Sequence, residues 1–182
     1  MALRLTRDAS HDPVLPGLNG PLRVDRRTKD LTKRLKQGDI AVIDHTDIDR
    51  VSGEALVHCR PLAVVNAGAS VSGRYPNAGP RLLIDAGVPL LDVDDEDLLD
   101  RLKDGMAASV EGDLLHLSSG DRVSGRRWDE GSLAAAMDEA RAGLSEQLES
   151  FAANTMEYIT QERDLLFDGV GVPEISTQML DR

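Results

Sequence analysis

The most constraining feature of the sequence is the stretch from Val64 to Asp92, in which apolar and polar segments follow one another. The β-branched run Leu62–Val65 leads into a polar loop, an apolar helix follows around Leu83, and a second strand is expected at Pro89–Leu91. Strand, loop, helix and strand in this order are typical of a layered α/β domain, where ligand-binding loops follow strand ends. The stretch therefore predicts an α/β fold.

The polar loop of this stretch is the best candidate for a binding site. It holds no acidic residue, although the chain of 182 residues carries a formal net charge of −11. Glycines, hydroxyls, an amide and one arginine suit a phosphate-bearing or other anionic ligand. The candidate ligand-binding residues are Gly68, Ser70, Ser72, Gly73, Arg74, Tyr75 and Asn77. The alternative is a turn-rich connection whose glycines serve backbone geometry, and both interpretations stay open.

Composition narrows the function classes. The chain is 41% hydrophobic but only 3% aromatic, so we expect an aliphatic core. Its negative charge argues against nucleic-acid binding, which needs clustered positive charge. Cys59 is the one cysteine, which excludes an internal disulfide and a cysteine-based zinc site. We see no signal peptide and no apolar run long enough for a membrane span, and therefore expect a soluble, cytoplasmic chain.

Four segments are predicted along the chain. Proline and glycine in residues 1–22 are typical of a flexible leader. Residues 23–126 hold the α/β domain, which opens with a basic cluster at residues 23–36. Because Leu31 and Leu35 lie one turn apart, this cluster predicts a short helix with a solvated basic face. Residues 130–166 form a long helix, and residues 167–182 a linker to a C-terminal domain that the sequence lacks.

The long helix is the strongest indication of a partner. Ser132 is expected to cap a proline-free segment that runs to Leu166, with apolar residues at three- and four-residue steps from Met137 to Ile159. About 33 helical residues would extend roughly 50 Å, more than a small domain can cover. We therefore expect Ser132–Leu166 to pack against a second copy, another domain or a partner. The alternative is two helices that break near Gly143 and fold back.

Two acidic groups resemble metal ligands but favour helix capping. The first precedes a helix expected at Val51–Val57, where Thr46 or Asp47 suits the N-cap. Its members are Asp44, His45, Asp47 and Asp49. The second, Asp94–Asp97, precedes another short helix and suits its first turn. We predict no metal site, no cofactor and no catalytic residues, because no base stands near the loop hydroxyls in the sequence.

Residues 38–117 resemble the swivelling β/β/α domain of phosphoenolpyruvate-utilising enzymes. The resemblance is carried by the order of strands and loops and by the motifs Gly87–Pro89 and Lys103–Gly105. In that family the loop carries a phosphocarrier histidine, whereas this sequence has Ser70–Arg74 there and no histidine between His58 and His116. The resemblance implies the fold, a swivelling-type domain followed by a long helix. Phosphotransfer through a histidine is not expected.

A second resemblance covers nearly the whole chain from about residue 17. Its segments are GPLRVDRRTKDLTKRL, GDIAVIDHTDIDR, AVVNAGASVSGRYPNAGP, ARAGLSEQLESFAANTMEYITQE and LLFDGVGVPEI. They are similar to the SteA family of actinobacterial septation proteins, whose members continue into a thiamin-pyrophosphokinase-like domain.

The septation family implies a non-catalytic regulatory or scaffold module in cell division. It also implies coupling to a membrane partner of the SteB type that controls peptidoglycan hydrolysis, and recruitment of the full-length protein to the septal membrane. In the alternative, the chain is a fragment of a thiamin-pyrophosphokinase-like enzyme that binds a nucleotide or phosphorylated ligand. Any kinase-like activity would then lie in the missing C-terminal domain.

Overall fold

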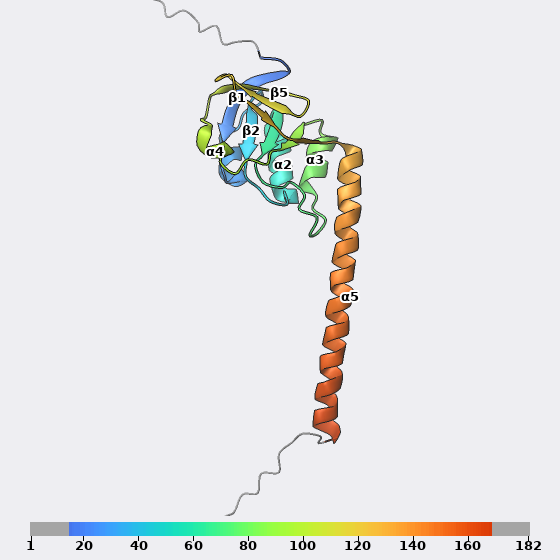
Figure 1. The fold of residues 1–182 in the computed structure, drawn as a ribbon. Coiled ribbons are helices and arrows are strands. Elements are labelled where there is room, and N and C mark those ends of the chain that lie inside the picture. Colours follow the sequence, from blue (N-terminus) through green and yellow to red (C-terminus); the bar gives the residue numbers. More distant parts are fainter. Residues whose placement is uncertain (1–14, 169–182) are drawn as a thin grey trace, which may run out of the picture. The chain divides into compact units, whose positions relative to one another are not determined.

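Eight strands form one mixed sheet in the computed structural model, which describes residues 15–168 (Figure 1). The strands are β1 (Leu18–Val24), β2 (Ile40–Ile43), β3 (Ala63–Asn66), β4 (Leu90–Asp92), β5 (Ala107–Glu111), β6 (Leu114–Leu117), β7 (Arg122–Ser124) and β8 (Arg126–Trp128). The helices are α1 (Thr28–Thr32), α2 (Arg50–Cys59), α3 (Gly79–Asp85), α4 (Leu98–Arg101) and α5 (Glu130–Asp168). The chain divides into two units, Met1–Arg141 and Ala142–Arg182, and all strands belong to the first.

The sheet order is β7-β6-β5-β1-β2-β3-β4-β8. Strands β1 to β4 pair in parallel, while β5, β6 and β7 form an antiparallel part that joins at β1, and β8 pairs antiparallel with β4. Every residue of β2 and β3 is buried, which explains why these strands are continuous apolar runs rather than alternating ones. The predicted mixed α/β class is confirmed.

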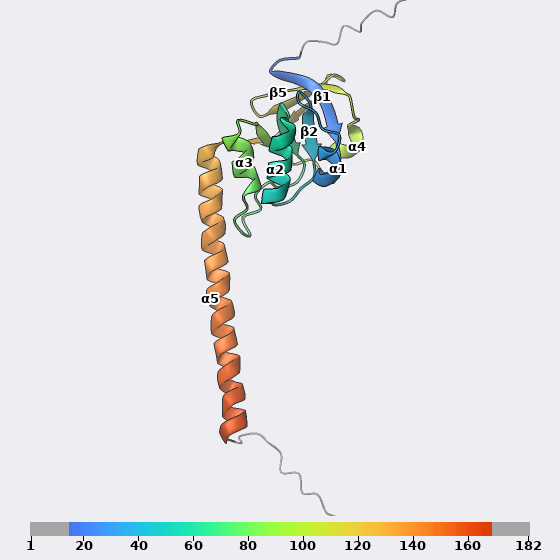
Figure 2. The same cartoon turned by 180° about the vertical axis from the view of Figure 1, so that it is seen from behind.

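Each face of the parallel strands packs into its own apolar cluster, because neighbouring residues of a strand point to opposite faces. On one face Val42 and Val65 pack in a cluster with Val110 and Leu115 of the antiparallel strands, so the sheet curls into a near-barrel. On the other face Ile43 and Val64 pack with residues of α1, α2 and α3, which Figure 2 shows on one side of the sheet.

Two glycines set the close contact between α2 and α3. A Cβ atom on Gly53 would lie 2.7 Å from the Cα of Gly79, and one on Gly79 would lie 2.4 Å from the carbonyl oxygen of Ile48. Real Cβ atoms do not approach a backbone this closely, so glycine is required at both positions. The contact fixes the start of α3 and with it the end of the candidate ligand loop.

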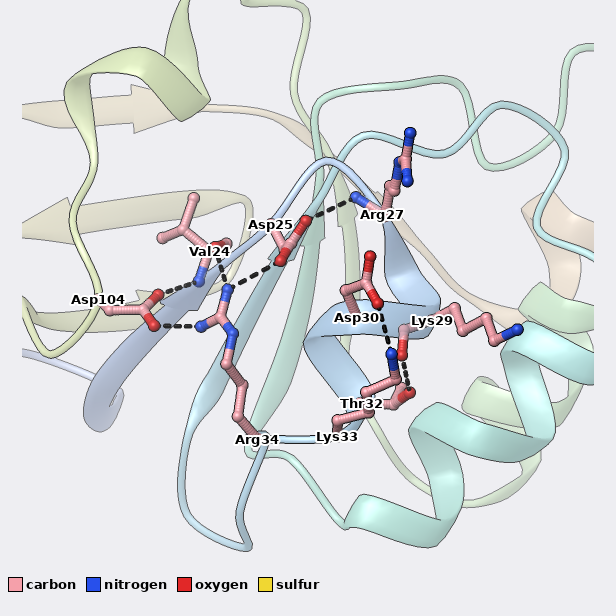
Figure 3. A network of polar contacts seen from close by, with 9 residues as sticks. All are labelled: Val24, Asp25, Arg27, Lys29, Asp30, Thr32, Lys33, Arg34 and Asp104. Atoms are coloured by element: carbon pink, nitrogen blue, oxygen red, sulfur yellow. Dashed lines mark hydrogen bonds and ion pairs between the residues drawn. The ribbon is translucent and has the colours of Figure 1, made fainter.

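The basic cluster is paired with acids rather than simply solvated. Leu31 and Leu35 are buried as expected, but the helix α1 is shorter than the cluster. Arg34 donates to the carbonyl of Val24 at 2.7 Å and to Asp25 at 3.0 Å, and it also pairs with Asp104 (Figure 3). These contacts tie the α1 region to the turn before β5 and neutralise much of the positive charge.

The predicted leader is too long at its C-terminal end. Residues 18–22 belong to β1, which pairs with β2 on one side and with β5 on the other. Glycine and proline made this segment resemble an arm, yet Gly20 serves packing, since a Cβ there would lie 2.4 Å from the carbonyl oxygen of Gly38. Residues 1–14 of the predicted leader lie outside the described residues.

Helix α5 runs without interruption through Gly143, so the two-helix alternative is wrong. Its cap is Asp129 rather than Ser132. The Asp129 carboxylate accepts from the Ser132 N–H at 2.7 Å, and the Ser132 hydroxyl accepts from the Asp129 N–H at 3.0 Å, which is a capping box. Hydrogen bonding from Ser132 to its carboxylate lowers the pKa of Asp129. Leu133 and Met137 are buried in the first unit.

The second unit contributes the rest of α5. From Ser145 to Arg163 every helical residue is exposed. The predicted linker at residues 167–182 lies, except for its first two residues in α5, outside the described residues. No helix in the part of the chain that the structure describes is both long and apolar enough to cross a membrane.

Candidate functional site

Asn66 organises the start of the candidate loop, which connects β3 to α3. Its side chain is fully buried, and its Oδ1 accepts from the backbone N–H of His45 at 2.9 Å and of Gly68 at 3.1 Å. Its Nδ2 donates to the carbonyl of His45 and to the hydroxyl of Ser70, both at 2.9 Å. One amide therefore joins the ends of β2 and β3, and a Cβ on Gly68 would lie 2.9 Å from the backbone of His45.

Ser70 and Asp92 link the loop to the sheet edge. Ser70 is fully buried and donates both its N–H, at 2.9 Å, and its hydroxyl to the Asp92 carboxylate. The indole Nε1 of Trp128, in β8, donates to the same carboxylate at 2.8 Å. Burial raises the pKa of Asp92, while the hydrogen bonds from Ser70 and Trp128 act in the opposite direction. Asp92 thus connects the loop, β4 and β8.

Ser72 makes the equivalent bonds to a second carboxylate. Its N–H donates to Asp47 at 2.7 Å and its hydroxyl at 2.6 Å. Asp47 is buried in a left-handed backbone conformation, with φ of 55°. The sequence predicted Thr46 or Asp47 as the cap of α2, but the cap is Asp49, whose carboxylate accepts from the Ser52 N–H at 2.7 Å. Capping was the right interpretation at the wrong residue.

The outer part of the loop is open. Gly73 has a positive φ of 80°, and Arg74 and Tyr75 are exposed. Among the described residues the Arg74 side chain has neither an ion pair nor a hydrogen bond. Asn77 turns inward, and its Nδ2 donates to the carbonyls of Ile48 at 3.0 Å and Ser70 at 2.7 Å.

The structure divides the seven predicted ligand residues into two groups. The side chains of Ser70, Ser72 and Asn77 donate hydrogen bonds to partners within the chain. Gly68 allows the loop to pack closely against the backbone of His45. Arg74 remains as an unpaired donor of the loop. An anion bound by the loop hydroxyls stays a prediction that would require displacing two carboxylates.

Sequence reasoning did not connect either carboxylate with the loop, since Asp47 was considered only as a helix cap or metal ligand and Asp92 was not considered. Asp92 ends β4, and Asp47 follows β2, so both lie at the edge where the parallel strands β2, β3 and β4 end. An acid placed directly at the end of a predicted parallel strand was the available signal, because such ends converge at one edge.

A cavity of about 470 Å³ lies beside the loop at this edge. The loop contributes its small residues Ala67–Ala69, and β4 and its following turn contribute Asp92 and Asp94. Ser124 at the end of β7 and Arg126 at the start of β8, which Gly125 joins, close it from another side. The Arg126 guanidinium stacks on the Trp128 indole, with its carbon 3.9 Å from the ring centroid.

The described residues contain no group of three or more His, Cys, Asp or Glu side chains that could hold a metal ion. His45 lies in the first predicted acidic group, but its Nδ1 lies 2.8 Å from the Thr28 hydroxyl, and its Nε2 lies 3.8 Å from Asp49. The loop hydroxyls of Ser70 and Ser72 both bond to carboxylates, an arrangement that holds the loop in place.

Comparison with known proteins gives distant structural likeness alone. No family model matches the chain, and no curated protein matches it significantly. The chain is similar to the crystal structure of 3-isopropylmalate dehydratase (leuD) from Methanocaldococcus jannaschii, with 12% identity and a TM-score of 0.43 over 74% of this chain and 98% of that one. It is also similar to RraAS2 from Streptomyces coelicolor, an unusual member of the RNase ES inhibitor RraA family, with 15% identity and a TM-score of 0.33 over 75% and 76%.

Proposed function

We propose that the chain is a non-catalytic scaffold and regulatory module that forms a homodimer through α5. The observation that carries the proposal is the exposure of large apolar side chains in the second unit. Leu148 is 58% exposed, Phe151 70% and Ile159 53%. Single exposed apolar residues are ordinary, whereas a row of them along one helix marks a surface that a partner covers.

The size of this surface fits a helix pair. With Met156 and Tyr158, five large apolar side chains of α5 are more than half exposed. Taking about 150–250 Å² for each such side chain when fully accessible, they expose on the order of 500–600 Å². Two copies that cover each other would bury about 1,000–1,200 Å², where specific interfaces begin.

The spacing of the side chains supports a partner that is itself a helix. Leu148 and Ile159 lie 11 residues apart. Eleven residues complete almost exactly three helical turns, so these positions return to the same face. An 11-residue repeat favours a pair of helices with a slight right-handed supercoil. A second copy offers the same repeat and hence a matching surface.

The cellular role rests on the resemblance to the SteA family. The proposed module acts in bacterial cell division, couples to a membrane partner of the SteB type that controls peptidoglycan hydrolysis, and works at the septal membrane in the full-length protein. The proposal includes a swivelling-type β/β/α domain for the first unit. Its support is the element order from β2 through the β5–β6 hairpin, which is the order expected from the resemblance to the swivelling domain of phosphoenolpyruvate-utilising enzymes.

The dimer is tested by the mass of the chain in solution. Light scattering after size exclusion should give twice the 19.7 kDa of one chain. Replacing Leu148 and Phe151 together by Asp should yield a monomer, because two charges would then face the pair. The matched control replaces Ser150 and Ala153 by Asp, each about 200° around the helix from the test residue two positions before it, and should remain a dimer. A monomeric parent chain would refute the proposal.

The role in division is tested in the bacterium of origin. Deleting the gene should leave daughter cells attached at their septa, and expression of the full-length protein should restore separation. The same protein with Leu148→Asp and Phe151→Asp should fail to restore it, whereas the Ser150→Asp, Ala153→Asp control should succeed. Normal separation after deletion would contradict the role in division but would leave the dimer proposal unaffected.

A further inference from the structure

We propose that the cavity between the loop after β3 and the connection from β7 to β8 binds a small oxyanion that also carries hydroxyl groups, such as a phosphorylated polyol. Arg126 would contact the anionic group, and Asp94 would accept from a hydroxyl. The cavity volume of about 470 Å³ suits a small molecule. The site lies beyond the ends of parallel strands β3 and β4, where open α/β sheets commonly bind ligands.

Arg126 is positioned in advance for this contact. Its guanidinium lies 3.9 Å from the Trp128 ring centroid, a stacking that holds the plane while leaving the N–H donors at its edge available. Among the described residues Arg126 forms no ion pair and no side-chain hydrogen bond. A preorganised and unpaired guanidinium binds a carboxylate or phosphate through two parallel hydrogen bonds.

The neighbouring arginine provides a contrast. Arg127 follows Arg126 in β8 and therefore points to the opposite face of the sheet, where it donates to the carbonyl of Gly112 at 3.4 Å. It does not line the cavity. The two residues share a strand and an exposed position, but they differ in access to the proposed site.

The acidic residues of the cavity select the class of anion. Asp92 already accepts three hydrogen bonds, two from Ser70 and one from Trp128. Asp94 is exposed and has no hydrogen-bond partner among the described residues. Two carboxylates beside one guanidinium repel a bare polyanion, whereas a hydroxyl group can donate to a carboxylate. The site therefore favours a singly phosphorylated or carboxylated molecule with hydroxyls over pyrophosphate.

The walls of the cavity are held by the fold. Gly125 lies so close to β4 that a Cβ there would lie 2.5 Å from the carbonyl oxygen of Asp92, which fixes the connection from β7 to β8 against β4. The loop contributes small residues at Ala67, Gly68 and Ala69, which leave space for a ligand, together with the apolar side chain of Val71. Arg74, the cation expected from the sequence to bind an anion, does not line this cavity.

Trp128 supplies a direct readout, because it is the only tryptophan of the chain and stacks under Arg126. Titration with glycerol 3-phosphate should change its fluorescence in a saturable manner. Pyrophosphate should bind more weakly and glycerol should give no change. Isothermal titration calorimetry should give the same order. No saturable change with glycerol 3-phosphate, or tighter binding of pyrophosphate, would overturn the proposal.

Variants locate the site. Arg126→Ala should weaken binding of glycerol 3-phosphate at least about tenfold, measured by calorimetry, since it removes a charged hydrogen-bond donor. Arg127→Ala and Arg74→Ala should bind like the parent chain. An affinity of Arg126→Ala equal to that of the parent chain would refute the assignment.

Asp94→Asn changes an exposed side chain and should reduce the preference for glycerol 3-phosphate over pyrophosphate. If the preference for glycerol 3-phosphate over pyrophosphate is unchanged, Asp94 does not contact the ligand. The mass in solution should stay the same in every variant, so this test is independent of the dimer.

Discussion

Replacing Asp92 tests whether one buried carboxylate holds the loop and β8 together. In Asp92→Ala the N–H and hydroxyl of Ser70 and the indole N–H of Trp128 lose their acceptor. An orphaned buried donor costs about 1–3 kcal/mol, and relief from burying a charge offsets part of the sum. We expect the free energy of unfolding to fall by about 3–5 kcal/mol, measured by urea denaturation at pH 7.

Asp92→Asn is the matched control. Its carbonyl oxygen can replace the Asp92 oxygen that accepts from the Ser70 N–H and the Trp128 indole. Its NH₂ group would then face the Ser70 hydroxyl, whose oxygen can accept but whose proton loses its partner. One hydrogen bond to a charged acceptor is lost, but the variant also avoids burying a charge, so we expect a net cost of about 1 kcal/mol. Equal losses in Asp92→Ala and Asp92→Asn would refute the reasoning from individual donors.

The pH dependence of the Asn variant follows from the raised pKa of Asp92. A carboxyl whose folded pKa is above its unfolded pKa binds more protons in the folded state between the two values. Its ionisation therefore costs stability as the pH rises through that interval. Asp92→Asn lacks this cost, so its deficit relative to the parent should shrink as the pH rises from about 4, the ordinary pKa of an aspartate, through the raised pKa of Asp92. A deficit that grows with pH would show that the hydrogen bonds outweigh burial.

Two glycine substitutions should have opposite effects. Gly79→Ala places a Cβ 2.4 Å from the Ile48 carbonyl oxygen and 2.6 Å from that of Asp49, so α3 must shift. We expect a loss of about 1–3 kcal/mol in urea denaturation, and an unchanged midpoint would contradict the close contact. Gly143→Ala meets no atom within 4 Å inside α5 and should raise stability by about 0.5–1 kcal/mol, seen as increased helicity on heating. A decrease would indicate that the helix needs glycine there.

The sequence predicted those elements whose periodicity is local. The runs that became β3, β4 and α2 were placed within one or two residues, and so was α5. Strand β1 was missed because Gly20 and Pro21 suggested an arm, while its pairing with β2 and β5 depends on residues far along the chain. Strand β8 was missed for a similar reason, because Arg126–Trp128 is short and gains its place only by pairing with β4.

The candidate loop shows where sequence reasoning ends. Its small polar residues were correctly identified as a loop at a strand end, but the partners of Ser70 and Ser72 are 22 and 25 residues away in sequence. Which carboxylate meets which hydroxyl depends on the order of strands in the sheet, and no local pattern encodes that order. The same limit hid the cavity, because its guanidinium comes from β8.

The two units of the chain differ in how their side chains are used: polar donors are paired inside the first unit, and apolar side chains are exposed on the second. In the first unit the donors of Ser70 and Ser72 are paired within the loop network, so changes there should alter the stability of the fold. In the second unit Leu148 and Phe151 are exposed, so most of their side-chain surface is not packed against other described residues. In the proposal above, this exposed apolar surface is the one that a second copy covers. Substitutions in the network should therefore lower stability without changing the mass of the folded chain, whereas substitutions on α5 should change the mass and leave the first unit folded.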